Sequence, residues 1–134
     1  MGYQKRAFTE SEWLKVMMTA REVINSLPKD MIMGGNGTGY PITNKDEICF
    51  NGNEIDDQYH ETFHITKAKY ADFNFCKTAS KPYDVAVVAV LCLVEHIAPG
   101  VLNIGSDGNS KDWAAGLALA QKIVPEVKLP SHIK

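Results

Sequence analysis

His64 and Cys76 are the residues whose types best suit catalysis, because an imidazole beside a thiol can activate it as a nucleophile. Aromatic and polar residues alternate from Tyr59 to Ile65 and again from Phe73 to Thr78, which predicts two strands of one hairpin. On this pattern His64 and Cys76 lie opposite each other on the polar face, with Cβ atoms about 5 Å apart. With Lys77 nearby, they could form a nucleophile pair or half of a metal site. No third group is evident, so solvated or packed side chains are the alternative.

The sequence predicts neither a bound metal nor a cofactor. His60 and His64 have the spacing of a helical metal pair, but four residues of a strand span about 13 Å. That is too far for two ligands that must each lie about 2.1 Å from one ion. The glycine run at 34–39 is followed by Tyr40 and not by the lysine that a phosphate-binding loop needs. Residues 107–112 lack the pattern of a calcium loop, so both segments are interpreted as turns.

The residues around Pro82 are candidates for binding a small anion. Pro82 predicts the first residue of a helix, and the exposed amides at a helix start attract anions. The polar residues that flank this start are Lys77, Thr78, Lys81, Tyr83 and Asp84. Helix capping, with the lysines in solvent, explains the same residues without a ligand. Both interpretations stay open.

Three helices are expected to position these residues. Thr9 and Glu12 have the pattern of a capping box, with Phe8 packed on Trp13, and predict a helix from about residue 10 to 26. An apolar stripe at helical spacing follows them, so one face of this helix is expected to be buried.

The apolar run from Val85 to Val94 predicts the central helix of the fold. This helix is expected to run from Pro82 to about Ile97, although its β-branched residues also suit a buried strand. Ser110 predicts the cap of a last helix from about residue 111 to 124, and residues 125–134 are expected to form an extended tail.

The remaining short apolar segments predict strands. Residues 48–50 and 101–104 are expected to be extended, besides the two strands between residues 59 and 78. The sequence therefore predicts a single α+β domain over residues 1–134. It would have an N-terminal helix, a mainly antiparallel sheet of four to five strands, and two C-terminal helices packed on that sheet.

Composition indicates a soluble protein of a reducing, cytoplasmic compartment. The chain is 45% hydrophobic and 22% charged, as ordinary globular domains are, and its three cysteines are too widely spaced for a disulfide framework. The longest apolar run is too short to cross a bilayer, which argues against a membrane partner. A net charge of −2 argues against nucleic acid. Lysines from Lys67 to Lys81 do alternate with aromatics, but those rings are expected to be buried and unable to stack on bases.

One segment resembles a group of known proteins. The sequence FCKTASKPYD, followed by the apolar run and then by SDGNSKDW, resembles small bacterial and phage-type proteins without an assigned activity. The resemblance covers roughly residues 61 to 120, and residues 75–84 are its most specific part. It implies that this order of strand, helix and loop is one folding unit, and it carries over no catalytic residues.

The hypothesis that follows is a small, non-enzymatic binding or interaction protein whose partner is itself, as a homo-oligomer, or another protein. The alternative is a small hydrolytic enzyme that uses Cys76, His64 and Lys77 or Lys81 near the helix start. A nucleic-acid-binding module is the third alternative.

Overall fold

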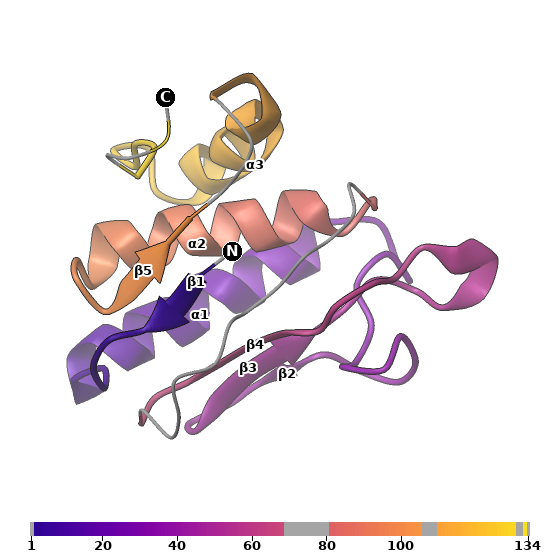
Figure 1. Ribbon diagram of the computed structural model, residues 1–134, viewed down its shortest axis with the longest axis horizontal. Helices are drawn as coiled ribbons and strands as arrows, with labels where there is room; N and C mark the ends of the chain where they lie inside the picture. The colour runs from indigo at the N-terminus through magenta and orange to yellow at the C-terminus, as the bar shows by residue number, and fades with distance from the viewer. Residues whose placement is uncertain (1, 69–80, 106–109, 131–132, 134) are drawn as a thin grey trace.

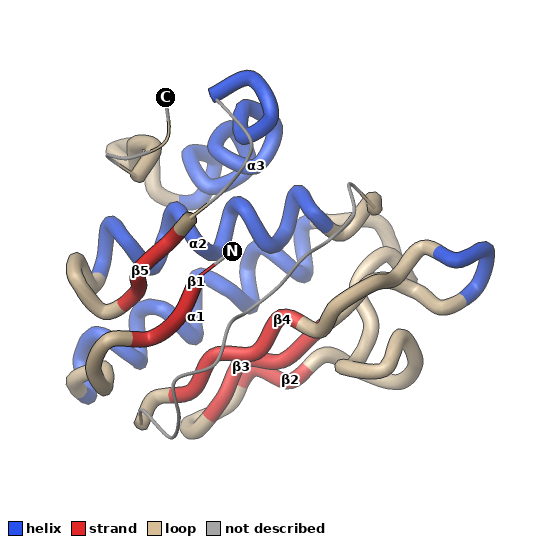
Figure 2. Tube along the Cα trace, viewed as in Figure 1, coloured by secondary structure: helices blue, strands red, loops and turns tan. Residues whose placement is uncertain are grey.

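The computed structural model describes residues 2–68, 81–105, 110–130 and 133, and the fold is α+β (Figure 1). Helix α2 lies between α1 and α3, and strands from two small sheets pack against this helical part (Figure 2). The helices are α1 (Glu10–Ser26), α2 (Asp84–Ile97) and α3 (Ser110–Ile123), and a short 3-10 helix, η1, spans Ile55–Asp57.

Helix α1 has the bounds that its sequence predicts. The Thr9 side chain accepts a hydrogen bond from the Glu12 backbone, and the Glu12 carboxylate accepts one from the Thr9 backbone, so the capping box is confirmed. The Phe8 and Trp13 rings meet edge to face with centroids 5.0 Å apart. The buried residues of α1 are Trp13, Val16, Ala20 and Val23.

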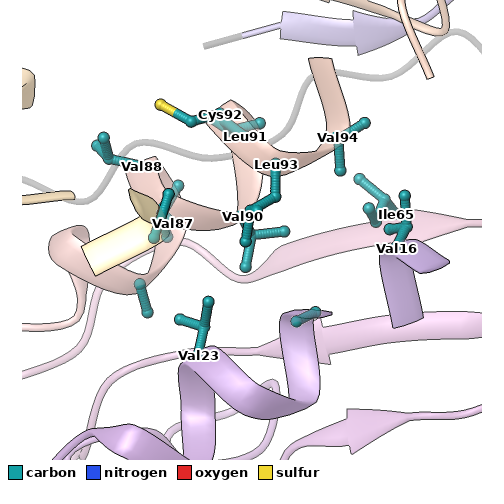
Figure 3. Packing of buried hydrophobic residues seen from close by; sticks show 14 of the residues in the cluster. Val16, Val23, Ile65, Val87, Val88, Val90, Leu91, Cys92, Leu93 and Val94 are labelled. Atoms are coloured by element: carbon teal, nitrogen blue, oxygen red, sulfur yellow. The ribbon is translucent and has the colours of Figure 1, made fainter. Parts of the chain in front are cut away.

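Helix α2 is the buried centre of the fold, as expected. Every side chain from Ala86 to Val94 is buried. In Figure 3, Val16 and Val23 of α1 and Ile65 of β4 (Phe63–Thr66) point toward it. The helix begins at Asp84, two residues after the expected start at Pro82, because Lys81 to Asp84 close a separate turn in which the Asp84 N–H bonds the Lys81 carbonyl.

Helix α3 crosses α2 closely at Gly116. A Cβ atom at Gly116 would overlap the Val88 side chain, so the crossing requires a residue without one. After α3 the chain was expected to form an extended tail. In the described part of this segment, Val127 and Ile133 are buried, and the Gln121 side chain of α3 donates to the Val127 carbonyl at 2.9 Å. The described part of this segment therefore packs on the body of the protein.

The described strands form two antiparallel sheets, so the single sheet of four to five strands is not confirmed. One sheet pairs β1 (Gly2–Gln4) with β5 (Leu102–Ile104), and the other has the order β2-β3-β4, with β2 at Ile42–Thr43 and β3 at Glu47–Phe50. Strands β3 and β5 lie where the sequence predicts them, whereas β1 was not foreseen. The proposed partner strand at residues 73–78 lies outside the described residues.

Strand β4 is shorter than expected. It begins at Phe63, and Tyr59 is 37% exposed, so the prediction that Tyr59 points inward with Phe63 was wrong. The reason is that buried Asn51 binds the preceding loop. Its side chain accepts from the His60 N–H at 3.1 Å and donates to the His60 carbonyl at 2.9 Å. These bonds take up the backbone groups that a strand would use for pairing.

A side chain joins the two sheets. The buried amide of Gln4 donates to the Thr66 carbonyl at 2.8 Å and accepts from the Thr66 N–H at 3.0 Å. Gln4 thus pairs with the backbone of β4 as a neighbouring strand would. The N-terminal strand is thereby fixed to β5 by its backbone and to β4 by this amide.

Candidate functional site

The histidine predicted to face Cys76 lies opposite another cysteine. His64 of β4 is the register partner of Cys49 in β3, and its Nε2 lies 3.2 Å from Glu47 Oε1. Along this antiparallel ladder, hydrogen-bonded and non-hydrogen-bonded pairs alternate. Asp46 and Lys67, three positions from Cys49 and His64, are a hydrogen-bonded pair, because the Lys67 N–H donates to the Asp46 carbonyl. His64 and Cys49 therefore form a pair of the closer, non-hydrogen-bonded kind. Cys76 lies outside the described residues, so its pairing with His64 stays a prediction.

The charge around Cys49 does not favour a nucleophile. Burial raises the pKa of its thiol, and the nearby carboxylate of Glu47 raises it further. A thiol with a raised pKa stays protonated at neutral pH, whereas the thiolate is the reactive form. Cys49, His64 and Glu47 thus have the residue types of a catalytic triad but not the electrostatics of one.

Two of the residues proposed to bind an anion at the start of α2 make contacts within the fold. The Lys81 ammonium lies 3.2 Å from the Asp57 carboxylate, and Tyr83 is fully buried, with its hydroxyl donating to the Glu61 carbonyl at 2.7 Å. Asp84 adds a negative charge in the first turn, which would repel an anion. The other candidates, Lys77 and Thr78, lie outside the described residues.

The two histidines four residues apart do not share an element. His60 is exposed in the loop before β4, whereas His64 is within the strand. In the part of the chain that the structure describes, no group of three His, Cys, Asp or Glu side chains is arranged to hold a metal ion.

The glycine run at 34–39 is a loop tied to its surroundings. The Asn51 side chain donates to the Gly35 carbonyl at 3.1 Å, and the Thr62 hydroxyl donates to the same oxygen. Gly37 adopts φ +87°, and its carbonyl accepts from the Glu54 N–H at 2.9 Å. This loop therefore connects the segment after α1 to the loop that carries η1.

Sequence reasoning missed a groove between the end of α1 and the segment that leads into β2. Its volume is about 820 Å³, within the range of ordinary binding pockets. Apolar groups of Ile24, Leu27, Ile32 and Met33 line it, together with Tyr40 and Pro41, and its charged residues are Arg21, Lys29 and Asp30. Tyr40 is 92% exposed at its rim.

Two exposed apolar side chains lie on the same flank of α1 as Arg21, which lines the groove. Leu14 and Met18 are 54% and 50% exposed, and at 100° per residue both lie on the flank of α1 that carries Arg21. Arg21 reaches β2, where its guanidinium donates to the Thr43 carbonyl at 2.8 Å. The signal for this surface was a second apolar pair in α1, offset from the stripe that faces the core.

The outer edge of β2 is closed against strand addition. The Thr43 carbonyl on that edge is bound by Arg21, and Pro41, two residues earlier and of the same orientation, has no N–H to donate. A partner on this side must therefore use the side chains of the groove and not the backbone of β2.

Comparison with known proteins found no match to this chain. Neither models of protein families, nor curated protein sequences, nor solved structures match the chain. Among the described residues no helix has the length and apolar character needed to cross a membrane.

Proposed function

We propose that this protein is a non-enzymatic interaction protein that binds a protein partner in the groove beside α1. The observation that carries the proposal is the exposure of Tyr40 at the rim of an apolar groove, with Leu14 and Met18 exposed on the adjoining flank. Large side chains that cost free energy in water are concentrated on surfaces that a partner covers. Tyrosine suits this position because its ring gives apolar area and its hydroxyl stays hydrated.

A binding role also agrees with the chemistry of the described side chains. The thiol of Cys49 has a raised pKa, so the described Cys and His pair gives no support to a hydrolase. Cys49 and Cys92 are free thiols, which supports a reducing compartment such as the cytoplasm.

Site-specific photocrosslinking tests the proposal. A photoreactive phenylalanine analogue replaces Tyr40 in one chain and Tyr3 in a control chain, because Tyr3 is also exposed but lies on β1, outside the groove. We expect a discrete protein adduct from position 40 that saturates with concentration and disappears with Met18→Asp. Mass spectrometry identifies the partner, whether it is a second copy of this chain or another protein. Equal adducts from positions 3 and 40, or none from position 40, would overturn the proposal.

A further inference from the structure

A loop with an apolar tip projects from the end of the protein that carries the groove. Figure 1 shows the η1 segment extending from the body beyond the strands. Ile55 is 67% exposed within it, and Glu54, Asp56 and Asp57 surround it with negative charge. Asp56 and Asp57 both have φ 57°, a left-handed conformation that is rare for residues other than glycine. The loop is thus a defined protrusion that keeps an isoleucine in water.

Local contacts hold this loop in its extended position. The Glu54 N–H bonds the Gly37 carbonyl at 2.9 Å, and Asp57 forms an ion pair with Lys81. Ile55 therefore does not fold back over its own protein, and its exposed side chain is available to a neighbouring molecule.

The groove has the complementary chemistry. Its walls are more apolar than polar, and among its charged residues Arg21 and Lys29 outnumber Asp30, which leaves a net positive charge. An isoleucine that carries carboxylates on both sides can place its side chain between the walls and its charges near the basic rim. An apolar segment that carries positive charges would be repelled by the groove.

The loop and the groove are also next to each other. The Asn53 side chain, at the base of the loop, donates to the Asp30 carbonyl at 2.9 Å, and Asp30 lines the groove. Both features therefore belong to one face of the protein. A two-fold axis through this face would bring each loop to the groove of the other molecule, as the closed symmetry of most homodimers requires.

We infer that the occupant of the groove is a second copy of this chain, whose Glu54–Asp57 loop inserts Ile55 between the groove walls. This inference rests on the proposed function, since it names the partner of the same groove. The dimer is symmetric, contains two identical loop-in-groove contacts, and weakens with salt because Arg21 and Lys29 face carboxylates across it.

Sedimentation of the full chain over a wide concentration range tests this inference. We expect a monomer–dimer equilibrium that Ile55→Asp weakens at least tenfold, because it removes a buried isoleucine from each of the two symmetric contacts. Tyr3→Asp is the matched control, because it adds the same charge on an exposed apolar side chain outside the loop and the groove, and it leaves the equilibrium unchanged. Circular dichroism confirms that the variants are folded.

A charge exchange locates the contact. Lys29→Glu and Glu54→Lys each weaken self-association, because both contacts of either homodimer then bring like charges together. An equimolar mixture of the two chains forms a heterodimer with one native contact between Glu54 and Lys29 and one contact in which both charges are exchanged. A chain that stays monomeric at every concentration, or a dimer that tolerates both Ile55→Asp and Lys29→Glu, would overturn the inference. If the chain is monomeric while position 40 crosslinks to another protein, the proposed function stands and only the second copy is excluded. If the chain is monomeric and position 40 gives no adduct, the proposed function and the inferred homodimer are both wrong.

Discussion

Helix α2 and the loops around β3 are held in place by different interactions. From Ala86 to Val94 the side chains of α2 are all buried and apolar, so shape complementarity fixes this helix. Around β3, asparagine side chains bond the backbone of the loops instead: Asn44 caps the turn into β3, Asn51 binds residues 35 and 60, and Asn53 binds Asp30. The comparison teaches that the core and the accessible surface of this protein depend on separate sets of interactions.

The largest expected effect breaks the packed region. Gly116→Ala adds a Cβ that overlaps Val88, and overpacking of this kind costs roughly 1–3 kcal/mol of unfolding free energy. Urea denaturation followed by fluorescence measures the loss. Ala115→Val, on the exposed side of the same helix, should cost less than about 1 kcal/mol. Val88→Ala should partly restore the stability of Gly116→Ala, and no restoration would show that the crossing is not the cause.

The second prediction breaks the hydrogen-bonded region. Asn51→Ala removes the hydrogen bonds to the partly buried Gly35 and His60 carbonyls. The Gly35 carbonyl keeps the Thr62 hydroxyl as a partner, so we expect a loss of about 1–2 kcal/mol of unfolding free energy. Hydrogen exchange should accelerate at the His60 and Gly52 amides, which both bond Asn51 Oδ1, while amides of α2 keep their protection. Asn36→Ala, which removes only exposed hydrogen bonds, is the control. Equal acceleration in α2 would mean that the two regions are not separate.

The third prediction concerns the start of α1 and its pH dependence. Hydrogen bonds from the Arg6 side chain and then from the Thr9 backbone lower the pKa of Glu12 to about 2. A carboxylate with a lowered pKa in the folded state stabilises the fold above its ordinary pKa of 4.5, and this contribution is lost as the pH falls from there toward 2. The melting temperature of the wild type should therefore exceed that of Glu12→Gln at pH 7. This difference should narrow as the pH falls from 4.5 toward 2. Thr9→Ala should cost about 1 kcal/mol at neutral pH.

The smallest expected effect is on the alkylation rates of two cysteines, one from each region. Burial raises the pKa of Cys92 in α2 to about 12, and burial together with Glu47 raises that of Cys49. At neutral pH, peptide mapping after alkylation should show slow labelling of Cys49 and labelling of Cys92 only on unfolding. Glu47→Gln should modestly increase the alkylation rate of Cys49, because it removes the negative charge that raises the pKa of this thiol. Labelling of Cys49 faster than a free cysteine would revive a nucleophilic role.

Local sequence patterns predict the elements whose bounds and burial are set by residues close together in the chain. The bounds of α1 follow from Thr9, Glu12 and an apolar stripe, and the burial of α2 follows from an uninterrupted apolar run. Both signals lie within a few residues of the element that they define. Propensity and capping are local properties, so a sequence carries them directly.

Long-range pairing decided the parts that could not be predicted. His64 pairs with Cys49 of a strand that lies earlier in the chain, and the alternation from Tyr59 could not show that Asn51 binds the His60 backbone. Strand β1 is only three residues long and depends on β5. The groove depends on how the segment after α1 crosses its end, and its one local signal was the offset pair Leu14 and Met18.

The pairing of β1 with β5, and of Gln4 with Thr66, sets an order for folding during synthesis. Residues 2–4 leave the ribosome before the other elements described here, and their backbone partners at residues 102–104 follow only after α1, the β2-β3-β4 sheet and α2. Strand β1 therefore remains unpaired until β5 has been synthesised. Closure of the fold is a late event, and a nascent chain halted before β5 would keep its first strand open to other chains.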